Sequence, residues 1–168
     1  MQRIKFPPVV NLWLELLRSG EFKPGPGIKL CQHLAGEWRW SSLGILAEAG
    51  VRKGIGCSQH DGGKVITFCV QGVKSIAFPP VPTVGAALLA TKTGVFRFMA
   101  PGETEPRETS LWRLGGTKFT FAEIAEIIEA NPDGLFLPPV RDQGSRIGSG
   151  SVYDLSESLF AKLLVATD

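Results

Sequence analysis

The sequence predicts a compact α+β domain in which about four antiparallel strands pack with three or four short helices. Three observations predict this class. Apolar residues recur at helical spacing near both ends of the chain, and β-branched runs separated by tight turns occupy the middle. The 168 residues also include 20 glycines and 12 prolines, which keep the elements short. A hydrophobic content of 43% suffices for one core in a chain of this length.

The first helix is expected at residues 8–18. Two prolines at positions 7 and 8 suit a helix start, and Ser19-Gly20 ends it. Its inward side is formed by Val9, Leu12, Trp13, Leu16 and Leu17. The following segment, 21–27, has two prolines and two glycines and predicts an irregular loop, and residues 28–31 predict a short strand.

The next two elements are a helix and a hairpin. A second helix is expected at residues 41–49, with Gly50 as its C-cap. Strands at 65–70 and 73–78 are joined by Gln71-Gly72, a two-residue turn typical of tight hairpins. This hairpin is the clearest β signal in the chain.

A second hairpin is expected between residues 85–91 and 95–99, with the turn at 92–94. Phe96 and Phe98 would share one face of its second strand, opposite Arg97. The sequence leaves an alternative open, because residues 86–90 also suit a short helix. Residues 100–110 are polar and predict a surface loop.

Two more helices are expected towards the C-terminus. Thr120 and Glu123 form a capping box, which opens a helix at 121–130. The last helix is expected at residues 155–166, capped by Asp154.

The domain organisation follows from these elements. We expect a single α+β domain over 1–140, a flexible linker over 141–151, and a C-terminal helical segment over 152–168 that docks on the domain or on a partner. No apolar run approaches the length of a membrane span, and no signal peptide is recognised at the N-terminus. Three cysteines in a chain with sufficient core favour reduced thiols and a cytoplasmic protein.

The net charge of +2 conceals an asymmetry. Residues 1–98 carry twelve Lys/Arg against five Asp/Glu, whereas residues 99–168 carry six against eleven. Either the two parts attract each other within one domain, or the basic part binds an anion. The absence of any Lys/Arg run longer than two does not favour nucleic-acid binding.

Catalytic and metal-binding patterns are weak. Cys31, His33, Cys57 and His60 supply the donor types of a zinc site or a Cys–His pair, but their spacing matches neither pattern. We therefore expect no catalytic set, no metal and no cofactor. Buried thiols beside solvent-facing imidazoles are the simpler interpretation.

The candidate binding residues combine cations with tryptophans. In an extended segment both indoles of Trp38-Arg39-Trp40 point one way, which suits stacking on a nucleotide-like anion. The predicted anion or ligand site comprises Lys23, Lys29, Trp38, Arg39, Trp40, Arg52 and Lys53. The alternative is a solvated basic surface, with those indoles packed against the first helix. Trp13 and Trp112 are expected in the core.

Three segments resemble a known group of proteins. NLWLELLRSGEFKPG at 11–25, WSSLGIL at 40–46 and LGGTKFTFAEIAEIIE at 114–129 resemble small phage- and prophage-encoded proteins of unsettled function. Their motifs read "W-ALRSGEY-Q-G", "CCLGVLC" and "GKTFAEIADIIE". This chain departs from the group's cysteines, with Ser41, Ser42 and Ala47 in their places. The resemblance implies a phage accessory protein, transfers no catalytic residue, and indicates a close-packing role for Gly44.

These observations predict a non-enzymatic phage accessory protein in the cytoplasm of the bacterial host. Its partner would be a host protein or an anionic, nucleotide-like small molecule, bound to counter host physiology or defence. A minor virion or assembly protein, or an enzyme that uses its Cys and His residues, are the alternatives. Pairing of two copies is left open by the apolar helix faces.

Overall fold

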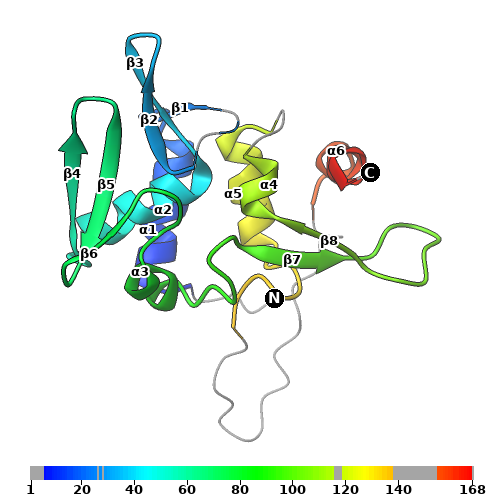
Figure 1. The fold of residues 1–168 in the computed structure, drawn as a ribbon. Helices are drawn as coiled ribbons and strands as arrows, with labels where there is room; N and C mark the ends of the chain where they lie inside the picture. Colours follow the sequence, from blue (N-terminus) through cyan, green and yellow to red (C-terminus); the bar gives the residue numbers. More distant parts are fainter. Residues whose placement is uncertain (1–5, 26, 28, 116–118, 138–154, 168) are drawn as a thin grey trace, which may run out of the picture.

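The computed structural model describes residues 6–25, 27, 29–115, 119–137 and 155–167. Two helices, α1 (Pro8–Arg18) and α2 (Ser42–Arg52), pack against each other at the centre. Figure 1 shows the larger sheet on one side of this pair, and α4 (Leu111–Leu114) and α5 (Phe121–Glu129) on the other. Helix α1 also packs against α5, so the central helices join the two sides.

The larger sheet is mostly antiparallel. Its order is β1 (Lys23–Pro24), β3 (Glu37–Trp40), β2 (Cys31–Leu34), β5 (Val65–Val70) and β4 (Cys57–Asp61). β6 (Val73–Ser75) also pairs with β5, and β1 runs parallel to β3. The predicted α+β class is confirmed. The described part of the chain forms six strands in this sheet and six helices in all, more than the four strands and three or four helices expected.

The tight hairpin is confirmed. Val70 pairs with Val73, and Gln71 and Gly72 both have positive φ angles, of 50° and 80°. Two successive positive φ angles match the twist of the flanking strands. The second strand is shorter than expected and ends at Ser75, whose hydroxyl donates to the Phe78 carbonyl.

For the second predicted hairpin, the expected partner of strand 95–99 is wrong. β7 (Val95–Phe98) pairs with β8 (Arg107–Ser110), which lies in the segment expected as a loop. Phe96 and Phe98 are buried and Arg97 is exposed, as the alternation predicts. The other expected arm instead contains the end of α3 (Val81–Ala86). The β7–β8 pairing is favoured because it buries the rings of Phe96 and Phe98. The sequence did not predict it because the residues of β8 are polar.

The observed ends of the two N-terminal helices agree with the prediction for α1 and differ from it for α2. α1 has the predicted bounds, whereas α2 continues past Gly50 to Arg52. Gly50 is therefore not a C-cap. It lies inside the helix, where an added Cβ would come 2.7 Å from the Thr83 side chain. The Ser41 hydroxyl caps the helix by accepting from the Gly44 amide at 3.0 Å.

The C-terminal helices pack through short apolar stripes. In α5 both hydrogen bonds of the predicted capping box are present. α6 (Glu157–Thr167) buries Leu159 and Leu163. The predicted linker 141–151 and the Asp154 cap lie outside the described residues.

One hydrophobic cluster joins the helices to strands β2, β3, β5 and β7. Trp13 is fully buried and its Nε1 donates to the Ser42 carbonyl at 2.8 Å, which ties α1 to the start of α2. Trp112 was expected in the core, but it is 49% exposed. None of the helices within the described ranges is long and apolar enough to cross a membrane.

Candidate functional site

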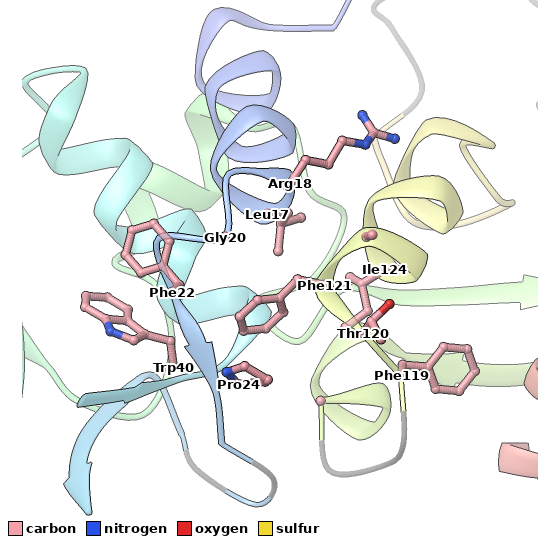
Figure 2. Close-up of a pocket in the computed structure, with 12 residues that line it drawn as sticks. Leu17, Arg18, Gly20, Phe22, Pro24, Trp40, Phe119, Thr120, Phe121 and Ile124 are labelled. Carbon is pink, nitrogen blue, oxygen red and sulfur yellow. The ribbon is translucent and has the colours of Figure 1, made fainter. Parts of the chain in front are cut away.

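An aromatic pocket opens where α1, the β1–β3 edge and α5 meet (Figure 2). Its volume is about 480 Å³. Apolar side chains supply most of its lining, and two polar side chains, Arg18 and Thr120, join them. The lining residues are Leu17, Arg18, Gly20, Phe22, Pro24, Trp40, Gly115, Phe119, Thr120, Phe121, Ala122 and Ile124.

The turn after α1 places the first aromatic side of the pocket. Gly20 adopts a φ of 75°, and the Ser19 hydroxyl accepts from the Glu21 amide at 3.0 Å. This turn directs Phe22 onto Trp40, the last residue of β3, with ring centroids 4.8 Å apart in an edge-to-face arrangement. Phe22 is buried and Trp40 is half-buried, so one face of this pair remains available to the pocket.

The start of α5 supplies the opposite side. Phe121 is the first residue of the helix and Phe119 lies just before the Thr120 cap. In Figure 2 the Phe121 ring lies across the pocket from Phe22 and Trp40. The capping box holds this end of α5, because Glu123 accepts from the Thr120 amide at 2.7 Å while its own amide donates to the Thr120 hydroxyl at 3.2 Å.

The charged group at the rim is already paired. Arg18 forms two hydrogen bonds of 2.6 Å to the Glu129 carboxylate. Its guanidinium points away from the aromatic rings in Figure 2. The pocket therefore presents aromatic surface with a polar rim whose charge is compensated.

Two of the predicted anion-binding cations meet at one carboxylate. Lys23 and Arg39 both form ion pairs with Glu37, and the Arg39 pair measures 2.7 Å. The hydrogen bond and charge of Lys23, with a smaller contribution from Arg39, lower the pKa of Glu37. A bound anion would have to compete with this carboxylate for both cations.

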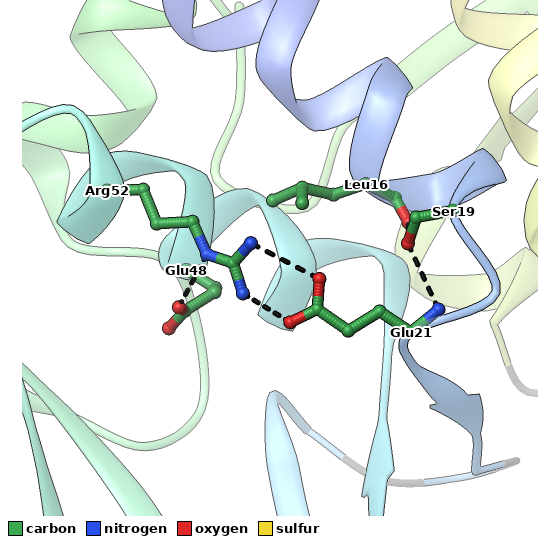
Figure 3. A network of polar contacts seen from close by, with 5 residues as sticks. All are labelled: Leu16, Ser19, Glu21, Glu48 and Arg52. Atoms are coloured by element: carbon green, nitrogen blue, oxygen red, sulfur yellow. Dashed lines mark hydrogen bonds and ion pairs between the residues drawn. The ribbon is translucent and has the colours of Figure 1, made fainter.

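A third predicted cation, Arg52, is held by two carboxylates (Figure 3). Its Nε donates to Glu48 at 3.0 Å, and its two terminal nitrogens donate to Glu21. Hydrogen bonding to Glu21 raises the pKa of Arg52 despite partial burial, with a further contribution from Glu48. This network ties the turn after α1 to α2.

The remaining two predicted cations lie far apart. Lys53 follows the C-terminal end of α2, whereas Lys29 lies near its other end, where its carbonyl accepts from the Ser41 hydroxyl at 2.6 Å. Both are exposed. An 11-residue helix is about 16 Å long, so these two lysines do not act on one small anion.

The indoles of Trp38 and Trp40 share one face of β3, as the alternation of a strand requires. Trp38 is half-buried between two imidazoles, with ring centroids 5.1 Å from His33 and 5.2 Å from His60. Arg39 points to the opposite face. The structure therefore separates the arginine from the tryptophans that were expected to act with it.

The predicted nucleophile candidates are in different environments. Cys31 is 3% exposed, and burial, with a smaller contribution from Glu48, raises the pKa of its thiol to about 12. Cys57 is exposed on β4. Across the described ranges, no three or more His, Cys, Asp or Glu side chains gather where they could hold a metal ion.

Comparison with protein families, with curated proteins and with solved structures gave no match.

Sequence reasoning missed most of the pocket, although the signal was present. Every residue lining it falls within three of the segments singled out in the sequence, 11–25, 40–46 and 114–129. These segments look structural one at a time, because each contains a helix end or a turn. The fold brings them together, and Trp40 is the one member of the predicted site that lines the pocket.

Proposed function

We propose that this chain is a non-catalytic accessory protein of the phage type, which binds a protein of the bacterial host. The aromatic pocket is its binding site, and a large apolar side chain of the partner occupies it. The observation that carries this proposal is the convergence of Phe22, Trp40 and Phe121 on one open pocket of about 480 Å³. A pocket of this size, lined mainly by apolar residues with several aromatic rings among them, suits a buried anchor residue.

The pairing of the cations favours a protein over a nucleotide-like anion. Lys23 and Arg39 are paired with Glu37, and Arg52 is paired with Glu21 and Glu48. An anion gains little from a cation that already has a carboxylate partner. An apolar anchor needs no such competition, since it gains by leaving water for the aromatic surface.

The environment of the Cys31 thiol and of the two imidazoles supports a non-catalytic role. The high pKa of Cys31 removes its thiolate at neutral pH. His33 and His60 contact the Trp38 ring. Both imidazoles therefore serve in packing against Trp38.

Blocking the pocket from an exposed position tests the proposal. Ala122 lines the pocket, is exposed, and lies in the first turn of α5, where an acidic side chain is favourable. Ala122→Glu should fill the pocket without disturbing the core. Ala161→Glu is the matched control, because Ala161 is an exposed alanine of α6 that does not line the pocket.

The readout is affinity purification of each variant from host cells, with bound proteins identified by mass spectrometry, and thermal-shift screening against nucleotides. We expect one host protein to bind wild type and Ala161→Glu at equal levels and to be lost with Ala122→Glu. Equal capture by the wild type and both variants would contradict the assignment of the pocket as the binding site. A nucleotide that raises the melting temperature of all three would instead support the anion alternative.

A further inference from the structure

Cys57 and Cys69 lie directly opposite each other on the neighbouring strands β4 and β5. They are partners in the antiparallel register, so both side chains point to the same face of the sheet. Burial and the nearby Cys57 contribute to a raised pKa of the Cys69 thiol. Neither belongs to the pocket, and the proposed function uses neither.

The spacing of the strands suits a disulfide. Directly opposite residues of antiparallel strands have Cα atoms about 4.5–5.5 Å apart, within the range of about 4.4–6.8 Å found for disulfides. Gly56 brings the backbone close at this point. Its φ is 93°, and an added Cβ would come 2.2 Å from the Cys69 carbonyl oxygen. Only glycine allows this approach, which positions Cys57 against Cys69.

The two thiols differ in access. Cys57 is exposed, whereas Cys69 is 8% exposed. Burial raises the pKa of Cys69, the neighbouring Cys57 and Asp61 add to this shift, and Lys74 opposes it from the adjoining strand. An oxidant therefore meets Cys57 first, and Cys69 is placed to react only with its neighbour.

We propose that Cys57 and Cys69 form a reversible dithiol–disulfide site whose oxidant is a low-molecular-weight disulfide such as oxidised glutathione. The Cys57 thiolate attacks one sulfur of that disulfide, and the released glutathione thiolate takes up a proton. The Cys69 thiolate then attacks the Cys57 sulfur of the mixed disulfide and expels the second glutathione. Two cysteine thiols are oxidised and one disulfide is reduced to two thiols, so electrons and protons balance.

The test uses the full chain in buffers of graded reduced and oxidised glutathione, followed by acid quenching, alkylation and peptide mapping. Before alkylation, we expect the wild type to be about 2 Da lighter than the reduced protein, because two hydrogen atoms leave when the Cys57–Cys69 bond forms. Cys31, which is buried and has a raised pKa, should remain reduced and be alkylated only after denaturation.

Two variants separate the steps. Cys69→Ala should accumulate glutathione on Cys57, because the resolving thiol is gone. Cys57→Ser should stay unmodified, because the remaining cysteines are buried. Because Cys57 is exposed, Cys57→Ser should not disturb the fold.

Two results would overturn the proposal. One is a wild type that keeps glutathione on Cys57 as extensively as Cys69→Ala does. The other is oxidation of Cys57→Ser at the wild-type rate, which would place the reactive thiol elsewhere.

Discussion

Gly44 shows how one residue fixes the approach of two elements. An added Cβ at Gly44 would lie 2.0 Å from the Leu30 carbonyl oxygen, a backbone atom that cannot rotate away. The start of α2 therefore touches the chain that leads into β2. The close-packing role inferred from the motif around Gly44 is confirmed.

Gly44→Ala should lower the free energy of unfolding by about 1–3 kcal/mol, the usual cost of overpacking a core. Gly85→Ala is the control, because Gly85 is helical and an added Cβ there meets nothing within 4 Å. It should leave stability unchanged or raise it by up to about 1 kcal/mol. Urea denaturation measures both, and equal effects would refute the close contact.

Two tryptophans offer a second residue-level comparison. Trp13→Phe removes the buried hydrogen bond to the Ser42 carbonyl and leaves space in the core. We expect a loss of about 1–3 kcal/mol. Trp112→Phe alters an exposed side chain and should change stability by less than about 0.5 kcal/mol. Thermal and urea unfolding distinguish the two, and a larger loss for Trp112→Phe would be the opposite of this expectation.

At the scale of elements, the start of α5 joins a cap to a tertiary contact. Glu123 accepts from the Thr120 amide and also pairs with Lys162 of α6 at 2.7 Å. Burial raises the pKa of Glu123, but the hydrogen bonds from Lys162 and Thr120 outweigh it, so the pKa lies below its ordinary value of 4.5. The ionised carboxylate thus holds both the cap and α6.

This depressed pKa predicts an acid-sensitive contribution to stability. The contribution is complete above the ordinary pKa of 4.5 and is lost as the pH falls through the lower pKa of the folded state. Glu123→Gln retains the capping geometry but does not titrate. Its stability should fall less than that of the wild type between pH 5 and about 3 in urea titrations. Parallel losses in both proteins would exclude this carboxylate as the cause.

The strands show where element prediction stops. The hairpin around Gln71-Gly72 was predictable, because apolar runs and a two-residue turn are local signals. β4 and β8 were missed, because their sequences, Cys-Ser-Gln-His-Asp and Arg-Glu-Thr-Ser, are largely polar. Each lies at one end of its strand order and is defined by its partner. Edge strands of this kind carry little periodic apolar signal of their own.

At the scale of the whole molecule, the charge asymmetry along the chain has a structural counterpart. The N-terminal, basic part meets the acidic part at Arg18–Glu129 and at Arg97–Glu108. Arg18 reaches from the end of α1 to the end of α5, beside the aromatic pocket. Attraction between the two parts of one domain is therefore visible at this contact.

A double-mutant cycle with Arg18→Met and Glu129→Gln should give a coupling energy of about 0.5–1 kcal/mol in low salt. The coupling energy stays small because the two side chains are 40% and 44% exposed. It should decrease in 1 M NaCl, at which the screening length is about 3 Å. A coupling that is insensitive to salt would show that packing, not charge, links the two helices.

The sequence by itself determined α1, α5, the capping box and the tight hairpin, since each is encoded by residues within one or two turns of each other. It also supplied the α+β class. Only the tertiary structure decided that Phe22, Trp40 and Phe121 line one pocket and that Cys57 faces Cys69. It also decided that most of the cations predicted to bind an anion form ion pairs with carboxylates of the protein itself. Contacts between residues distant in the chain depend on how the elements pack, and the spacing of residues within one segment does not determine that packing.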